Sequence, residues 1–314
     1  MEEPPASPGS TIADDDMTAD TVLYHGGDVI IVSEEQPKIR FIVSSILLAH
    51  VSPVFQAMLC GNFIEGRSRS ASEPRTLPLD DPVDSLEFLL RLVHHRMVIE
   101  RGNIRPRHMV RLAIISDKYQ CSDIITWHVR EWFRTCSRTW NFHETCCMVV
   151  TAAISNVPDE FRRLTSSLIM DFPTELSEIS EDEGLSPWIK TGAVNQMAKQ
   201  RLAVKAELMQ ALRDHEATLL ACGCGIQLDS ALLSTAIKSI LERCLSNTIE
   251  SFKALGRQIP TCPQHGRQPR PECPGLDFDE VPTVRTGLCL SCYKSNSSKM
   301  WTCKGHEYPL IQQE

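Results

Sequence analysis

The sequence predicts an α+β protein in which a small mixed sheet flanked by helices precedes an all-α region, a long helical hairpin and a small Cys/His-rich tail. Three observations support this class. Two short β-rich apolar runs lie near the N-terminus, at 27–32 and 38–43. Segments with helical apolar spacing fill most of the chain after them. Pairs of Cys and His two residues apart gather late in the chain.

The two apolar runs flank the turn-like sequence SEEQP and predict a β-hairpin. The following SSILLAH predicts a short helix that Ser44 or Ser45 caps. A second short helix is expected over SPVFQAMLC, where Ser52 and Pro53 form a typical helix start. Its apolar spacing places Phe55 in the core.

After the polar loop 66–75, TLPL predicts a short strand and DDPVDSLEFLLRLVHHR predicts a helix. Asp81 is expected to cap this helix, with Pro82 in its first turn. At the other end we expect His94 and His95 to face solvent, because adjacent helical positions diverge and rarely share a ligand.

Apolar periodicity predicts four helices after this region and two long amphipathic helices after an acidic linker. The two long helices, separated by CGCGIQLD, are expected to form a hairpin. The four helices span 106–119, 121–135, 141–155 and 157–171, the linker 172–187, and the hairpin helices 188–221 and 229–256.

Charge is unevenly distributed along the chain, whose formal net charge is −8. Twelve of the 40 acidic residues lie in 1–20 and 171–183, which contain no Lys or Arg. The remainder therefore carries 28 acidic residues against 32 basic ones and is only mildly basic. That balance does not favour nucleic-acid binding, which requires clustered Lys and Arg on one face.

The thirteen cysteines are odd in number, and the acidic N-terminus has no basic start followed by an apolar core. Both features favour a reducing, intracellular location, cytoplasmic or nuclear, in which Cys is a core residue or a metal ligand. No apolar run reaches the length of a membrane span, so no membrane partner is expected.

Several short motifs occur in an order that resembles the BTB/POZ family, over residues 22–171. LAIISDKYQC followed by Trp127 and Trp132 resembles the helical extension of fungal BTB proteins. Ser44 stands where many members have His. The other matching motifs are Gly27-Asp28-Val29, Phe41, Ser52-Pro53-Val54-Phe55, Ala57-Met58, Phe63-Ile64-Glu65-Gly66 and LPLDDPVDSLEFLLRLVHHR.

The resemblance implies a non-enzymatic protein-interaction module that forms a homodimer, with Val29 and Leu47 near the dimer interface. Some members bind a cullin scaffold and serve as substrate adaptors of ubiquitin ligases. In those proteins an apolar residue lies two positions before a Glu, a pattern that Phe63 and Glu65 match. An aromatic side chain can fill a partner's pocket while a neighbouring acid fixes orientation at the rim. The alternative is that Phe63 folds onto its own core and Glu65 is solvated.

The Cys/His-rich tail contains three pairs whose spacing suits tetrahedral, structural zinc. One site is expected from Cys262, His265, Cys289 and Cys292. A second would join Cys222 and Cys224 to Cys303 and His306, and Cys273 could replace a ligand in either. Free thiols in a disordered tail are the alternative. A redox role for Cys289 and Cys292 is not favoured, because no βαβ pattern precedes them.

These observations predict a homodimeric interaction protein that could act as a cullin adaptor for a substrate protein the sequence does not identify. The alternative is a transcription-related regulator whose zinc-binding tail contacts nucleic acid or another protein. The expected domains are an acidic disordered tail (1–20), a BTB/POZ domain (22–104), a helical extension (105–171), an acidic linker (172–187), a helical hairpin (188–256) and a zinc-binding tail (257–314).

Overall fold

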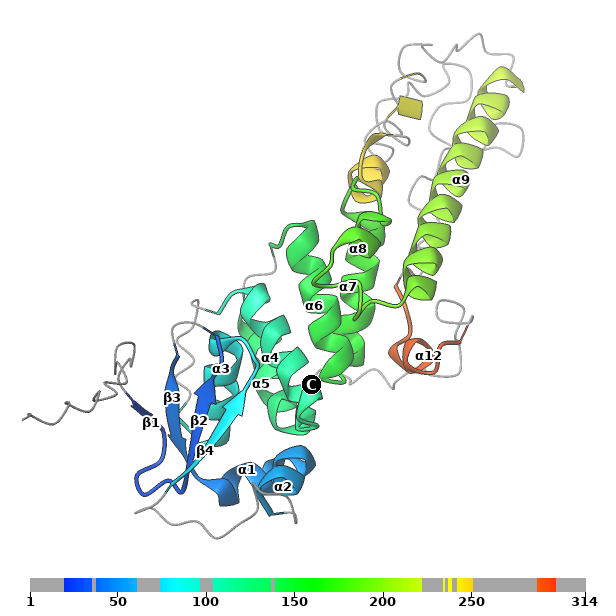
Figure 1. The fold of residues 1–314 in the computed structure, drawn as a ribbon. Coiled ribbons are helices and arrows are strands. Elements are labelled where there is room, and N and C mark those ends of the chain that lie inside the picture. The colour runs from blue at the N-terminus through cyan, green and yellow to red at the C-terminus, as the bar shows by residue number, and fades with distance from the viewer. Residues whose placement is uncertain are drawn as a thin grey trace, which may run out of the picture. The chain divides into compact units, whose positions relative to one another are not determined.

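The protein has an α+β fold, seen here in a computed structural model (Figure 1). It divides into two compact units, Met1–His128 and Val129–Glu314. The structure describes residues 20–35, 38–60, 74–96, 104–136, 139–221, 234, 237–238, 242–250 and 287–297.

Four strands of the first unit form one mixed sheet in the order β1-β3-β2-β4 (Figure 1). The predicted hairpin is confirmed, because β2 (Val29–Ser33) pairs antiparallel with β3 (Arg40–Val43). The edge strands β1 (Thr21–Val22) and β4 (Arg75–Leu79) lie parallel to β3 and β2, respectively. The β-branched residues of β2 suit this central, mostly buried position.

The helices of the first unit begin and end close to the predicted residues. They are α1 (Ser45–Val51), α2 (Pro53–Cys60), α3 (Val83–Val93), α4 (Pro106–Lys118) and α5 (Ser122–Thr135), which continues into the second unit. Phe55 is fully buried, as expected. The core joins the sheet to α1, α2 and α3 through the side chains of Phe41, Leu48, Phe55, Leu59, Leu86, Leu89 and Leu90.

The start of α3 differs from the expected cap. Asp81 makes no capping bond, and the first helical N–H, that of Val83, donates to Glu35 Oε2 at 2.8 Å. The Asp81 carboxylate instead accepts hydrogen bonds from Lys118 Nζ and the Tyr119 hydroxyl. The cap was assigned wrongly because the true partners of Asp81 lie 37 and 38 residues along the chain.

The second unit is helical in its described residues. It contains α6 (Phe142–Ile154), α7 (Pro158–Met170), α8 (Glu178–Glu181), the long α9 (Thr191–Ala221) and α12 (Leu290–Lys294). Helix α7 packs against α6, α9 and α12.

Two polar arrangements fix helix ends in this unit. Asn141 and Glu144 form a reciprocal capping box at the start of α6, with bonds of 2.8 and 3.1 Å. At the end of α7 the buried Arg201 guanidinium donates to the carbonyl oxygens of Leu168, Ile169 and Thr174. A cation therefore satisfies carbonyl groups that a helix C-terminus leaves without partners.

Two segments of the second unit differ from the expectation. The acidic stretch 172–187, predicted as a linker, contains α8 and buries the side chains of Leu176, Ile179 and Leu185. The described part of the expected helix 229–256 is interrupted at 243–244 before helix resumes.

Candidate functional site

Helices α1 and α2 expose apolar side chains in a segment without Asp, Glu, Lys or Arg. Residues 44–60 contain no Asp, Glu, Lys or Arg, and Ile46 is 77% exposed. Pro53, Ala57 and Cys60 are exposed on α2. We call these four residues and Leu47, which is half-buried, the α1–α2 face. Exposed apolar side chains that gather on one surface are a feature of protein-interaction sites.

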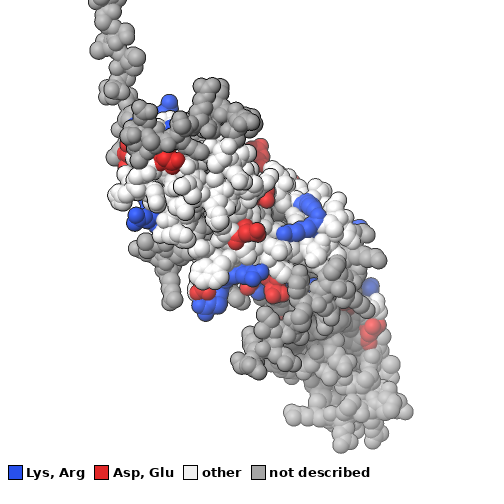
Figure 2. All heavy atoms as spheres, turned by 90° about the horizontal axis from the view of Figure 1, so that it is seen from below, with Lys and Arg blue, Asp and Glu red and all other residues white. Residues whose placement is uncertain are grey.

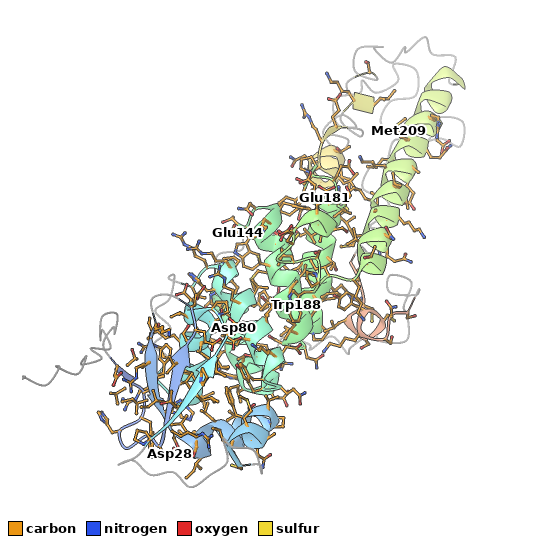
Figure 3. All side chains as sticks on the ribbon, viewed as in Figure 1. Asp28, Asp80, Glu144, Glu181, Trp188 and Met209 are labelled. Atoms are coloured by element: carbon orange, nitrogen blue, oxygen red, sulfur yellow. The ribbon has the colours of Figure 1, made fainter. Side chains whose placement is uncertain are left out.

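Four hydrogen bonds hold helices α1 and α2 in place. Asp28, labelled in Figure 3, accepts from Ser45 N at 2.8 Å and from Ser45 Oγ at 2.5 Å, so a carboxylate caps α1. Ser52 Oγ donates to the Tyr119 carbonyl at 2.6 Å and accepts from Phe55 N at 3.0 Å. The rings of Phe55 and Tyr119 also stack, with centroids 4.3 Å apart. The α1–α2 face therefore rests on a fixed scaffold.

A buried polar group extends this scaffold to α3. The Tyr119 hydroxyl donates to Asp81 Oδ2 at 2.6 Å, and Lys118 Nζ lies 2.7 Å from Asp81 Oδ1. Burial, followed by the nearby Asp81 carboxylate, raises the pKa of Tyr119. The phenol therefore stays protonated and remains a hydrogen-bond donor at neutral pH.

His94 connects α3 to the start of α1. Its Nε2 accepts from Ser44 N at 3.0 Å, and its Nδ1 lies 2.8 Å from Leu90 O. Because Nε2 must accept, Nδ1 carries the proton and donates. Burial is the main cause that lowers the pKa of His94, and the positive charges of His95 and Arg96 add to it. The prediction that both histidines face solvent is correct for His95 and wrong for His94, which is buried.

The residues predicted to contact a partner or a second copy of the chain differ in how the structure describes them. Phe63 and Glu65 lie outside the described residues. Val29 is 0% exposed within the sheet of one chain. Leu47 is half-buried on α1, and its neighbour Ile46 is the most exposed large apolar residue described. The helical spacing of SSILLAH did not distinguish these two positions, because both are apolar.

Charges on the described surface are mixed. Figure 2 shows one face on which Lys and Arg side chains lie among Asp and Glu. Ion pairs within helices join Arg91 to Glu87 at 2.6 Å and Arg134 to Glu131 at 2.7 Å. No continuous basic patch is seen among the described residues of this face, which is the feature that a nucleic-acid interface requires.

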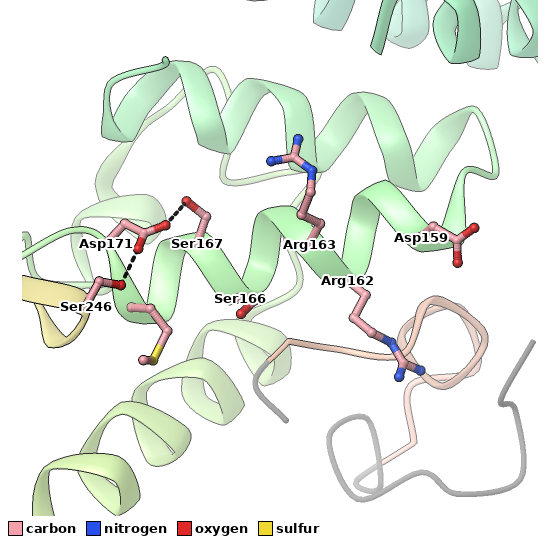
Figure 4. A pocket seen from close by; sticks show the side chains of 8 residues that line it. Asp159, Arg162, Arg163, Ser166, Ser167, Asp171 and Ser246 are labelled. Atoms are coloured by element: carbon pink, nitrogen blue, oxygen red, sulfur yellow. Dashed lines mark hydrogen bonds between the residues drawn. The ribbon is translucent and has the colours of Figure 1, made fainter. Parts of the chain in front are cut away.

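A cavity of about 680 Å³ lies along one side of α7 (Figure 4). Arg162 and Arg163 leave the helix in different directions, and Asp171 bridges Ser167 and Ser246. These groups do not converge on a single point, so they form no nucleophile–base pair. The lining residues are Asp159, Arg162, Arg163, Ser166, Ser167, Met170, Asp171 and Ser246.

Residues 287–297 bring Cys289 and Cys292 onto the second unit. Gly287 has φ +103°, and a Cβ there would lie 2.4 Å from the Arg162 carbonyl oxygen, so only glycine fits. Leu288 N donates to Thr165 Oγ1 at 2.8 Å. Both cysteine residues are buried.

Tyr293 and Lys190 secure the other end of α12. The Tyr293 hydroxyl donates to the Trp188 carbonyl at 2.7 Å, near the labelled Trp188 of Figure 3. Lys190 Nζ donates to the carbonyls of Tyr293 and Lys294 and lies 5.0 Å from the Tyr293 ring centroid. Phe161 packs against the same ring at 4.9 Å. These contacts join residues more than 100 positions apart.

The other predicted zinc ligands lie outside the described residues, as does Cys273. Within the described part of the chain, no group of three or more Cys, His, Asp or Glu side chains has a geometry that could hold a metal ion. The predicted ligands not described are Cys222, Cys224, Cys262, His265, Cys303 and His306.

Cys146, Cys147 and His143 resemble parts of a catalytic site, but their environment opposes that role. Burial raises the pKa of both thiols to about 12. Cys147 Sγ lies 3.8 Å from His143 Nδ1, and His143 Nε2 lies 3.0 Å from Asp182. A nucleophilic cysteine needs a lowered pKa and access to substrate, so these are core thiols.

No family model matches the chain, and no curated protein matches it. None of the described helices is both long enough and apolar enough to span a bilayer.

Proposed function

We propose that residues 20–128 form a protein-interaction domain of the BTB/POZ kind, which pairs two copies of the chain through the α1–α2 face and performs no catalysis. The observation that carries this proposal is Ile46, which is 77% exposed within a segment of 17 residues that has no charge. The order of strands and helices in this unit is consistent with the resemblance noted in the sequence.

The expected interface is self-complementary. A two-fold dimer places the same surface on both sides, so each contact of Ile46 occurs twice. Burying one aliphatic side chain of this size contributes about 1.5–3 kcal/mol. Two copies of Ile46 would therefore contribute about 3–6 kcal/mol, a substantial share of the free energy of a micromolar dimer.

The test compares Ile46→Asp with Leu202→Asp. Leu202 is a matched control, because it is an aliphatic residue that is 65% exposed on α9 in the other unit. Sedimentation velocity over a concentration series measures the dimer dissociation constant of each variant. Ile46→Asp should weaken dimerisation at least about 100-fold, because it removes two apolar contacts and places two carboxylates in the interface.

Equal dissociation constants for wild type and Ile46→Asp would contradict the proposed surface. Circular dichroism on the same samples reports whether each variant is folded. Since Ile46 is largely exposed, we expect its replacement to change the fold very little.

A cullin scaffold is the partner that Phe63 and Glu65 suggest, and an adaptor role is proposed on that sequence pattern. A pull-down from host extract, with a Phe63→Ala/Glu65→Ala variant of equal thermal stability, tests this role. Capture of a cullin by wild type and its loss in the variant would support an adaptor. If wild type captures no cullin, the adaptor role fails while the dimer proposal still stands.

A further inference from the structure

We infer that the His94 side chain is a pH-sensitive switch for helix α1: the neutral ring holds the start of the helix, and the protonated ring releases it and weakens pairing through the α1–α2 face. The effect on pairing rests on the proposed dimer. The switch itself is a property of one chain, so it is tested separately from the dimer.

Backbone groups occupy both nitrogen atoms of the His94 ring. Nε2 accepts from Ser44 N at 3.0 Å, and Nδ1 donates to Leu90 O at 2.8 Å. His94 is only 6% exposed, so water does not readily replace these partners. An imidazolium carries a proton on each ring nitrogen and accepts no hydrogen bond. Protonation therefore sets the Nε2–H of His94 against the N–H of Ser44, and the bond between them is lost.

The lost bond lies at the point where α1 begins. Ser44 is the N-cap residue of α1 and makes no side-chain capping bond. Its carbonyl oxygen accepts the first helical hydrogen bond, from Leu48 N at 3.2 Å. Ile46, which is 77% exposed, is the second residue of the helix. Release of Ser44 therefore acts two positions from the side chain that is proposed to contact a second copy.

Other contacts keep the release local. Asp28 accepts from Ser45 N at 2.8 Å and from Ser45 Oγ at 2.5 Å, and neither bond involves His94. Ser52, at the other end of α1, bonds to the Tyr119 carbonyl and to Phe55 N. We therefore expect protonation of His94 to loosen the first turn of α1 while α2 and the sheet stay folded.

The surroundings of His94 place the change in mildly acidic solution. Burial is the main cause that lowers the pKa of His94, and the neighbouring charges of His95 and Arg96 oppose a further positive charge. Arg96 Nε donates to Leu23 O, and the Tyr24 ring centroid lies 6.3 Å from that of His94. Because an unperturbed histidine titrates near pH 6.5, the His94 ring stays neutral above that pH and takes up a proton below it.

The expected effect is larger for the dimer than for one chain. Loss of one hydrogen bond changes an equilibrium about 3- to 10-fold. A two-fold dimer contains the switch twice, so the factor is squared in the dissociation constant. Acid should therefore raise the dissociation constant about 10- to 100-fold.

Hydrogen exchange of the full-length wild type tests the switch without any variant. Protection of peptides from 44–51, expressed relative to the intrinsic exchange rate, should fall about 3- to 10-fold between about pH 7.5 and about pH 5.5. Peptides from β2 and β3 should lose less. Equal protection of α1 at both pH values would overturn the inference. So would an equal loss in the sheet, because acid would then destabilise the whole unit rather than release one helix.

His94→Gln assigns the pH dependence to this residue. The glutamine side chain offers Ser44 an acceptor that does not titrate in this range, so α1 protection should be the same at both pH values. His50→Gln is the matched control, because His50 is an exposed histidine on the same helix, one turn after Ile46. It should keep the wild-type loss. A pH dependence that survives in His94→Gln and disappears in His50→Gln would overturn the inference.

Sedimentation velocity at the same two pH values tests the effect on pairing. The dissociation constant should rise about 10- to 100-fold in acid for wild type and His50→Gln, and should not change for His94→Gln. A wild-type dimer with the same dissociation constant at both pH values would overturn the link between His94 and the α1–α2 face. A wild type that is monomeric at about pH 7.5 contradicts the proposed dimer instead, and the exchange of α1 then decides the switch by itself.

Discussion

Tyr119→Phe should destabilise the first unit by about 1.5–3 kcal/mol, which is the contribution of a hydrogen bond to a charged group. The hydroxyl donates to Asp81 at 2.6 Å, and both side chains are almost fully buried. Phenylalanine keeps the ring that stacks on Phe55, so the change isolates the hydroxyl. Among the described residues, the buried carboxylate would then retain its bond from Lys118 alone.

Lys118→Met is the matched control for this prediction. The Lys118 side chain is 52% exposed, so solvent screens its ion pair with Asp81 and the expected loss is about 0–1 kcal/mol. Asp81 keeps its bond from Tyr119 in this variant. Tyr119→Phe and Lys118→Met each remove one hydrogen bond to the Asp81 carboxylate. The two variants differ mainly in the burial of the replaced side chain, because Tyr119 is buried and Lys118 is half exposed.

Hydrogen exchange followed by mass spectrometry measures both effects within one chain. Peptides from β2 and β3 report the opening of the first unit, and peptides from α6 serve as an internal reference in the second. Tyr119→Phe should accelerate the slowest exchange of β2 and β3 about 10- to 100-fold and leave α6 unchanged. If Lys118→Met accelerates exchange as much as Tyr119→Phe, burial does not determine the contribution of this group and the reasoning is refuted.

Two further predictions concern His94 and Gly287. Because His94 has a lowered pKa in the folded state, the unfolded chain binds its proton first as pH falls below about 6.5. Stability against urea should therefore be unaffected by this group above pH 6.5 and fall below it, and His94→Gln should show a shallower fall. Gly287→Ala places a Cβ 2.4 Å from the Arg162 carbonyl and forces alanine to φ +103°, a conformation that costs about 1–2 kcal/mol even without the clash. Exchange of the Leu288 amide should become at least about 10-fold faster.

The His94 and Gly287 predictions each have a control variant and a result that would contradict them. His50→Gln, a change of an exposed histidine on α1, should leave the pH dependence as in wild type, and an unaltered slope in His94→Gln would show that His94 does not cause it. Gly184→Ala, in an exposed turn with negative φ, should not alter Leu288 exchange. Wild-type exchange at Leu288 in Gly287→Ala would mean that the turn is not held against α7.

Local sequence patterns predicted most elements of this fold. The β-branched runs of β2 and β3 and the apolar stripe of α3 depend on neighbours a few residues away, so their periodicity is visible in the sequence. The buried position of Phe55 followed from the same spacing. The starts of α6 and α7 likewise fall beside the capping Asn141 and the first-turn Pro158.

The features that the sequence did not predict all depend on contacts between residues far apart in the chain. His94 is buried because it reaches Ser44, 50 residues earlier, and Asp81 binds residues on a later helix. Residues 287–297 dock onto a surface formed more than 80 positions earlier. Gly287, in RTGLC, permits a close backbone approach, but a glycine in a sequence does not identify what approaches it.

The exposed Ile46 could not be separated from Leu47 in the sequence, because a helix start with two adjacent apolar residues fits either orientation. Its place on the surface follows from how α1 packs on α2 and α3. The proposed dimer surface therefore rests on tertiary packing, whereas the family resemblance rests on local motifs.

The mass of the wild-type chain in solution is the most direct test of the proposed self-association. Light scattering on the full-length protein at tens of micromolar should give about twice the 35.3 kDa of one chain, falling toward one chain on dilution. A mass of one chain at the highest concentration would contradict a dimer built on the α1–α2 face.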